Sequence, residues 1–210
     1  RFRIAYSFSL PKATRADRPA DPGAGCSATD GVWQNSCNDP DFTWTAADDG
    51  ASGIAGYHVY WGTDPNGTGT TFTTTTAYDP DPVSEGTYYL RVDTEDTLGH
   101  RTGWKTLFVF RYDTTAPNNP AATPDCGASS GVWQNTCGDP TFMLLGASDG
   151  ESSVAAYEVY WGPNAGATSG STQTGTAYDA ASVSSGNIYY LRVRTGDEAG
   201  NWSGWATLFE

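Results

Sequence analysis

The residues with the clearest potential for chemistry are acidic side chains in short polar stretches. AADDGASG (46–53) and DTEDTLGH (93–100) each hold several carboxylates, and similar stretches recur later in the chain. Ca²⁺ takes six to eight hard oxygen ligands, which carboxylates and backbone carbonyls can supply. Asp is also common in turns, where it hydrogen-bonds nearby backbone, so turn formation is the alternative. The candidate calcium ligands are Asp48, Asp49, Asp93, Asp96, Asp149, Glu151, Asp197 and Glu198.

Catalytic chemistry has little support in the sequence. A nucleophile–His–carboxylate site needs a histidine, and the only two are His58 and His100. The equivalent positions of the repeat described below hold Glu158 and Asn201 instead. Neither a Gly-x-Ser-x-Gly elbow nor a glycine-rich phosphate loop occurs. We therefore expect no enzyme activity and no catalytic residues.

The chain is a tandem repeat. CSATDGVWQNSC (26–37) and CGASSGVWQNTC (126–137) share their cysteine spacing and the core GVWQN. GWKTLF (103–108) returns as GWATLF (204–209), with one extra residue gained in between. Self-similarity at a fixed offset indicates two copies of one module, with a single insertion in a loop.

The four cysteines form two equivalent pairs. Three connectivities are possible, but two identical modules should each close the same bridge, Cys26–Cys37 and Cys126–Cys137. Each bridge closes a short loop and contributes about 3 kcal/mol if it is unstrained. The competing interpretation is a metal site, but zinc modules use closer cysteine spacing and histidines. A disulfide implies an oxidising, extracellular compartment.

Strand signals dominate each module. They are short, rich in aromatic and β-branched residues, and separated by Gly, Asp and Pro clusters, which is typical of a β-sandwich. In the first module they are DFTWTA (41–46), IAGYHVYWG (54–62), GTTFTTTTAY (69–78), TYYLRVDTED (87–96) and WKTLFVFRYD (104–113).

A family resemblance rests on YHVYW followed by YYLRVDTEDTLGHRTGW, and on YEVYW followed by YYLRVRTGDEAGNWSGW. These motifs resemble fibronectin type III-like and bacterial immunoglobulin-like modules of cell-surface proteins, and the joint DTTAP is similar to linkers of bacterial surface proteins. The resemblance implies an all-β chain of two tandem sandwiches and an extracellular setting. It does not specify a ligand, because these folds host many functions. In such a sandwich the acidic stretches of each module share one end, so their carboxylates could converge.

The repeat boundaries and the Pro-rich segments predict four regions. They are an N-terminal strand arm with linker (1–20), β-sandwich module 1 (21–113), a Pro-rich linker (114–125) and β-sandwich module 2 (126–210).

Carbohydrate could be a bound ligand or a covalent modification of the chain. Exposed aromatic rings form platforms for sugars, but Trp33, Trp61 and Trp104 recur in the second module, which favours core packing. Trp202 is the one unmatched loop tryptophan. Asn66 and Asn201 match the N-glycosylation sequon, a short pattern that also arises by chance.

Charge limits the partners. The net charge is −13, yet residues 1–20 carry five basic side chains and one acidic one. An acidic body disfavours nucleic acid, because phosphate contacts need clustered Lys and Arg. No apolar run is long enough for a transmembrane helix, so we expect no membrane insertion.

The arm begins RFRIAYSFSL, in which Phe2, Ile4, Tyr6, Phe8 and Leu10 alternate with small or charged residues. This period of two predicts a strand with one apolar face, which needs a partner sheet. Three partners are possible: its own first module, a preceding module of which the arm is the last strand, or another subunit.

Another subunit is favoured by two observations. The first module ends LFVFRYD while the second stops at LFE, which leaves a sheet edge open. The basic arm also complements the acidic body. The sequence thus predicts a non-catalytic extracellular structural protein, a surface or filament subunit that polymerises head to tail by donating its N-terminal strand. The alternative is an adhesion or glycan-binding segment of a larger surface protein.

Overall fold

Only β-strands, turns and loops occur in the part of the chain that the structure, a computed structural model, describes: residues 27–48 and 52–210. The chain divides into two compact units, with unit 1 ending at Tyr112 and unit 2 spanning Asp113–Glu210. The N-terminal arm, Cys26 and Asp49 lie outside the described residues. Within the described ranges no helix is long and apolar enough to cross a membrane.

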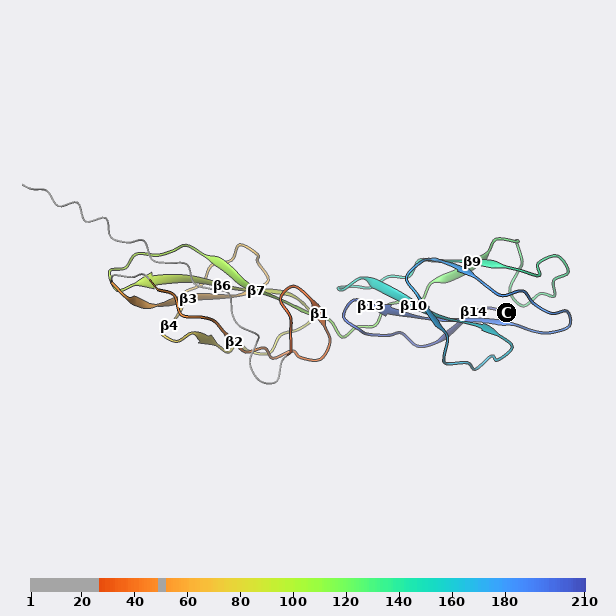
Figure 1. Cartoon of the computed structure of the whole chain (residues 1–210), viewed down its shortest axis with the longest axis horizontal. Helices are drawn as coiled ribbons and strands as arrows, with labels where there is room; N and C mark the ends of the chain where they lie inside the picture. Colours follow the sequence, from red (N-terminus) through yellow and green to blue (C-terminus); the bar gives the residue numbers. More distant parts are fainter. Residues whose placement is uncertain (1–26, 49–51) are drawn as a thin grey trace, which may run out of the picture. The chain divides into compact units, whose positions relative to one another are not determined.

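Unit 1 consists of a five-stranded sheet and a two-stranded sheet (Figure 1). The larger sheet has the order β1-β7-β6-β3-β4, and the smaller one pairs β2 with β5. All pairs are antiparallel except β1 with β7, which is parallel. The strands are β1 (Trp33–Gln34), β2 (Phe42–Thr43), β3 (Ile54–Gly62), β4 (Thr71–Thr73), β5 (Ala77–Tyr78), β6 (Gly86–Asp96) and β7 (Lys105–Tyr112).

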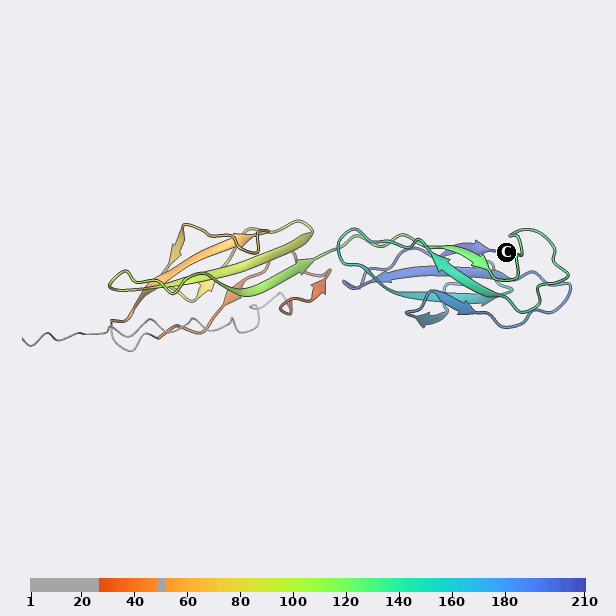
Figure 2. The same cartoon turned by 90° about the horizontal axis from the view of Figure 1, so that it is seen from above.

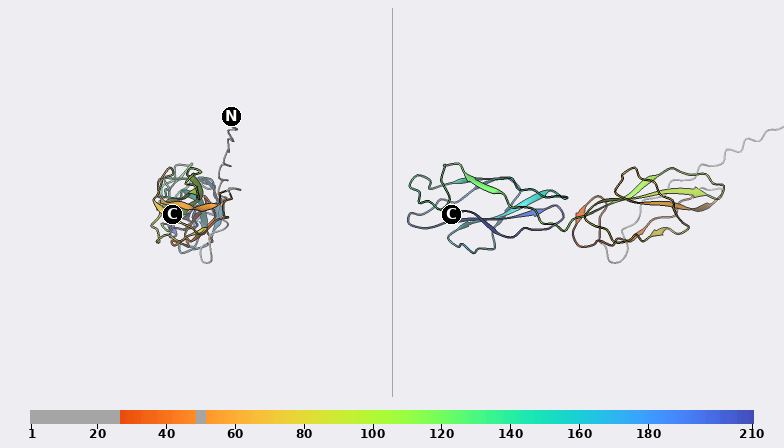
Figure 3. Two further views of the ribbon diagram at one scale, coloured as in Figure 1. Left: turned by 90° about the vertical axis from the view of Figure 1, so that its left-hand side faces the viewer. Right: turned by 180° about the vertical axis from the view of Figure 1, so that it is seen from behind.

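Unit 2 has a four-stranded sheet of order β11-β10-β13-β14 and a three-stranded sheet of order β12-β9-β8. Figure 2 and the right-hand view of Figure 3 show these layers from other sides. The strands are β8 (Ala121–Pro124), β9 (Thr141–Leu145), β10 (Val154–Gly162), β11 (Ser171–Gln173), β12 (Ala177–Asp179), β13 (Tyr190–Asp197) and β14 (Ala206–Phe209).

Strand β8 corrects the predicted linker, residues 114–125. This stretch was expected to be a Pro-rich spacer, but its second half pairs antiparallel with β9, from Ala121 opposite Leu145 to Pro124 opposite Phe142. Proline lacks an N–H donor and is tolerated on an edge strand, which is where β8 lies. Ala122 packs against the core of unit 2. The linker composition therefore hides the first strand of the second sandwich.

The core of each unit lies between its two sheets. In unit 1, Phe42 of the small sheet packs in one cluster with Val59, Leu90 and Phe108 of the large sheet. Unit 2 repeats this cluster with the equivalent residues Phe142, Val159, Leu191 and Phe209. Alternate residues of each central strand are buried, as the period of two requires. The predicted all-β fold of two tandem sandwiches is confirmed.

Gly170 tests the packing of β10 against the loop before β11. A Cβ atom placed there would collide with the backbone carbonyl of Val159, which cannot move without distorting the central sheet. Gly170→Ala should therefore lower the free energy of unfolding by about 2 kcal/mol or more, measured by urea unfolding. Gly175→Ala is the matched control, because a Cβ at that position meets no atom within 4 Å. Equal stability of the two variants would contradict this packing.

Candidate functional site

The segment after the first cysteine contacts the last strand in the same way in both units. The Gly31 N–H donates to the Val109 carbonyl at 2.8 Å, and the Gly131 N–H donates to the Glu210 carbonyl at 3.0 Å. Val109 and Glu210 therefore occupy equivalent positions, as the repeat offset of GWKTLF and GWATLF requires.

Beyond this position the two units differ. In unit 1, residues 110–112 of β7 form the middle of three strands. On one side Trp33 and Gln34 of β1 pair with Arg111 and Tyr112. On the other side the first residues of β6, 86–88, pair with 110–112. Phe110 is fully buried in the core of this unit.

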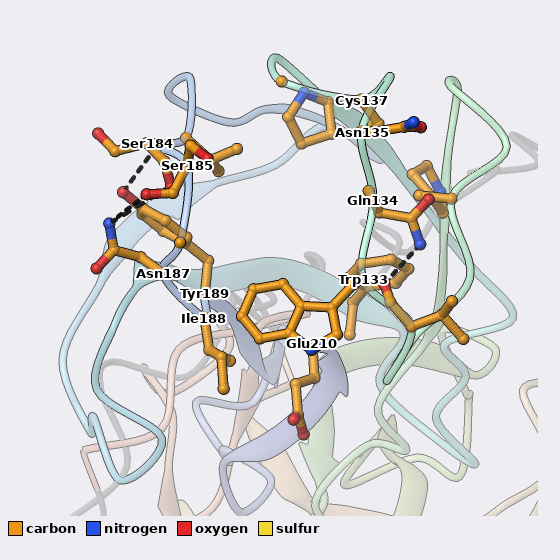
Figure 4. A pocket seen from close by; sticks show the side chains of 18 of the residues that line it. Trp133, Gln134, Asn135, Cys137, Ser184, Ser185, Asn187, Ile188, Tyr189 and Glu210 are labelled. Atoms are coloured by element: carbon orange, nitrogen blue, oxygen red, sulfur yellow. Dashed lines mark hydrogen bonds between the residues drawn. The ribbon is translucent and has the colours of Figure 1, made fainter.

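Unit 2 contains the equivalents of both flanking segments, and Glu210 takes the position of Val109. β14 ends at Phe209, and residues 133–134 and 187–189 belong to no strand. Between them lies a groove with a volume of about 630 Å³. Figure 4 shows residues 184–189 on one side, 133–135 on the other and Glu210 at the bottom. The two segments that bound the groove are thus the equivalents of those that pair with residues 110–112 in unit 1.

The groove exposes apolar surface that unit 1 covers. Trp133 is 73% exposed and Ile188 is 44% exposed. In unit 1 the equivalent Trp33 is only partly exposed, and the guanidinium of Arg111 lies 5.6 Å from its ring centroid. The expectation that repeated tryptophans pack in the core holds for Trp61 and Trp161, which pack against their cores. It is wrong for Trp133.

Trp202 does not offer a free platform for a sugar ring. The guanidinium of Arg194 lies 4.8 Å from the ring centroid of Trp202 and 5.5 Å from that of Trp205. Arg194 also forms an ion pair with Glu158 at 2.5 Å. These tryptophans therefore hold a charged side chain in place.

A second candidate site is a group of three carboxylates in unit 2. Oxygens of Asp113, Asp149 and Asp197 lie within 4.8 Å of one another. Two of these residues were predicted as calcium ligands, whereas Asp113 was not. Asp113 lies at the start of the DTTAP stretch, whose sequence indicates only a joint between the two modules. The exposed Glu151 and Glu198 lie outside the group.

The environment of the group is polar but incompletely satisfied. Asp113 is 0% exposed, and its Oδ2 has no hydrogen-bond partner; Asp149 Oδ1 is also buried without one. Burial alone would raise the pKa of Asp149, but N–H donors of Glu151, Ser152 and Gly150 and a contact with Asp113 lower it below its usual value. Asp149 is therefore held in the charged form close to another buried carboxylate.

In unit 1 the counterpart of Asp197 and a neighbouring carboxylate are paired with basic side chains. Asp96, the counterpart of Asp197, accepts from the N–H groups of Leu98 and His100, and its Oδ2 lies 2.9 Å from His100 Nδ1. Asp93 forms an ion pair with Arg101 at 2.8 Å. Asp48 is exposed, and the described residues of unit 1 contain no group of three such ligands.

The remaining sequence candidates are placed as follows. His58 Nε2 lies 2.6 Å from Glu95 Oε2, so this histidine belongs to an ion pair on the sheet. Asn66 is exposed in the turn after β3. The amide of Asn201 is engaged, since its Nδ2 donates to the Asp113 carbonyl at 3.0 Å and to Asp197 Oδ2 at 2.9 Å.

The predicted disulfide of unit 2 is present. Cys126 and Cys137 are bonded, with their Cα atoms 5.7 Å apart. Cys37 is also disulfide-bonded, while its predicted partner Cys26 lies outside the described residues. The bridge of unit 2 closes the segment that carries Trp133, on one side of the groove.

Comparisons with known proteins find likeness only among solved structures. No protein-family model and no curated protein sequence matches the chain. The chain is similar to fibronectin(III)-like modules of Clostridium thermocellum CbhA, with 14% identity, a TM-score of 0.40 and coverage of 86% of this chain and 88% of that one. It is also similar to the FN1–FN3 domains of chicken CNTN1, with 16% identity, a TM-score of 0.33 and coverage of 92% and 66%. No ligand or activity follows from likeness at this level.

Asp96 should make unit 1 sensitive to acid. Burial would raise its pKa, but the hydrogen bonds from His100 and Leu98 and the charge of His100 outweigh burial and lower the pKa to about 2. The unfolded chain takes up this proton near pH 4, so the stabilising effect is full above that pH and is lost as pH falls toward 2. Asp96→Asn should lower stability at pH 7 and weaken the loss between pH 4 and 2, measured as urea midpoints.

The exposed Asp39 supplies the control for this prediction. Asp39→Asn should leave both the midpoint at pH 7 and its acid dependence unchanged. An Asp96→Asn chain with the acid dependence of the unsubstituted chain would show that other carboxylates control it.

Proposed function

We propose that this chain is a non-catalytic extracellular structural subunit that assembles head to tail, residues 1–10 of one copy adding a strand to the unit 2 groove of the next. The main support for this proposal is the difference between the two repeats at equivalent positions. In unit 1 a strand fills the space between the segment after the first cysteine and the start of β6. In unit 2 the same space is an open groove.

The sequence of the arm fits this groove in one register. Glu210 is equivalent to Val109, so the next positions correspond to Phe110, Arg111 and Tyr112 of unit 1. Phe2, Arg3 and Ile4 reproduce this order, with apolar side chains at alternate positions and an arginine between them. Since Arg111 lies over Trp33, this register places Arg3 over Trp133.

Strand addition at this site gains hydrogen bonds on two sides. Each ordered residue costs about 1–2 kcal/mol of backbone entropy, while a buried large apolar side chain contributes about 1.5–3 kcal/mol. Apolar burial alone therefore roughly balances the ordering of a strand in which every second residue is buried. Ladder hydrogen bonds to residues 133–134 and 187–189 supply the surplus, since both segments lack strand partners in unit 2.

Charge favours the same partner. Unit 2 contains ten acidic residues and two basic ones, whereas residues 1–20 contain one acidic and five basic residues. The side chain of Glu210 lies at the bottom of the groove (Figure 4). Opposite charges speed association of arm and groove, and the like charges of two acidic units disfavour other contacts.

The compartment and the geometry of assembly follow from the same features. The disulfide of unit 2 requires an oxidising environment, which supports an extracellular location. An arm that enters a different surface of the next copy makes a heterologous contact, and such contacts extend into filaments unless they close into a ring.

Two variants test the assembly by sedimentation velocity over a range of concentrations. The chain of residues 1–210 should form oligomers that grow with concentration. Deletion of residues 1–10 should leave monomers, because the donor strand is removed. Adding Phe-Arg-Tyr-Asp after Glu210, copied from residues 110–113, should also give monomers, because the groove is then filled within the same chain.

An added Ser-Arg-Ser-Asp tail is the matched control and should leave assembly intact, because it cannot bury apolar side chains. Strict monomers of the unaltered chain at high concentration, or polymers that persist after the deletion, would refute the proposal. A glycan array probed with the deleted chain addresses the alternative: specific binding that is lost in Trp133→Ala would favour an adhesion module.

A further inference from the structure

The three carboxylates of unit 2 have the separation expected around one bound cation. Ligand oxygens at 2.3–2.6 Å from Ca²⁺ lie at most about 5 Å apart, and oxygens of Asp113, Asp149 and Asp197 all lie within 4.8 Å of one another. Each residue comes from a different part of the unit: its first residue, the loop between β9 and β10, and the end of β13. Such convergence requires the complete fold.

A second observation distinguishes this group from an ordinary acidic surface. Asp113, a member of the group, is fully buried, and its Oδ2 accepts no hydrogen bond. Asp149 Oδ1 is likewise buried and unpartnered. Burying a charged oxygen without a partner is costly, so a cation at this point would satisfy both atoms.

The basic residues of unit 2 do not neutralise the group. Arg194 is paired with Glu158, and Arg192 donates to the backbone carbonyls of Ala167 and Trp205. These are the only basic side chains in unit 2, which has no histidine. The side chain of Asn201 orients the group by donating to Asp197 and to the Asp113 carbonyl, but it adds no charge.

In unit 1 the counterpart of Asp197 is paired with a basic side chain. There His100 takes the place of Asn201 and pairs with Asp96, the counterpart of Asp197. Arg101 pairs with the neighbouring Asp93. Unit 2 has Asn201 at the position of His100, so this basic side chain is lost while the carboxylate of Asp197 is kept; Asp93 and Arg101 correspond to Arg194 and Trp202.

We propose that Asp113, Asp149 and Asp197 bind a divalent cation that prefers hard oxygen ligands, Ca²⁺ before Mg²⁺. The ion ties the first residue of unit 2 to two loops at one end of its sandwich. The larger Ca²⁺ is preferred because it accepts irregular sets of carboxylates and carbonyls, whereas Mg²⁺ demands near-ideal octahedral geometry. This site is independent of strand donation.

Calorimetric titration of CaCl₂ into the metal-free chain lacking residues 1–10 tests the proposal without interference from assembly. One site per chain should appear, and the unfolding temperature should rise with Ca²⁺ and return with EDTA. Asp113→Asn should weaken Ca²⁺ binding at least tenfold. Without Ca²⁺ this variant should melt no lower than the parent, because it removes repulsion between carboxylates.

Glu198→Gln is the matched control, since Glu198 is an acidic residue close in sequence to Asp197 but exposed and outside the group. It should bind Ca²⁺ as the parent does. No binding heat together with no shift in melting would overturn the proposal, and so would an equal loss in Glu198→Gln. Equal shifts with MgCl₂ would also overturn it, because they would indicate general screening of an acidic unit.

Discussion

The structure depends on backbone pairing at the end of the last strand of each sandwich. In unit 1, residues 110–112 satisfy two neighbours at once, a parallel one at Trp33–Gln34 and an antiparallel one at the start of β6. Phe110 simultaneously fills the end of the core against Trp61. Because a buried or edge backbone group needs a partner, one short segment determines whether this end of a sandwich is closed.

The two units show how one template accommodates different local chemistry. The central strand pairs of the two units have the same register: Tyr57 lies opposite Thr94 in unit 1, and the equivalent Tyr157 lies opposite Thr195 in unit 2. Two of their differences lie at the ends of the strands, where loops tolerate substitution. At one end unit 1 uses His100 where unit 2 uses Asn201. At the other end Arg111 covers Trp33, whereas Trp133 is exposed.

Sequence patterns predicted those features of the structure that depend on the repeat and on the period of two in the strands. Strand alternation and the turn residues between strands were sufficient for the all-β sandwiches, and the repeated cysteine spacing was sufficient for the bridge Cys126–Cys137. Three features needed coordinates. The proline-rich composition of residues 114–125 concealed the edge strand at 121–124, because an edge strand tolerates proline. Asp113 joined Asp149 and Asp197 only through tertiary folding, since 36 residues or more separate these positions. The exposure of Trp133 is not encoded in its own motif, because its counterpart Trp33 is covered by Arg111, which lies 78 residues further along the chain.

The groove and the carboxylate group share one electrostatic property, an excess of negative charge in unit 2. Unit 2 has ten acidic and two basic residues, and its two arginines are both engaged on the sheet. Neither Glu210 at the groove nor the buried Asp113 therefore has a basic partner within unit 2. Self-repulsion of this kind opposes compaction unless positive charge comes from outside the unit. A basic strand at one end and a divalent cation at the other would each supply it locally, where Coulomb interactions are least screened. The same imbalance that opposes contact between two acidic units thus favours both the basic strand and the divalent cation proposed as ligands of unit 2.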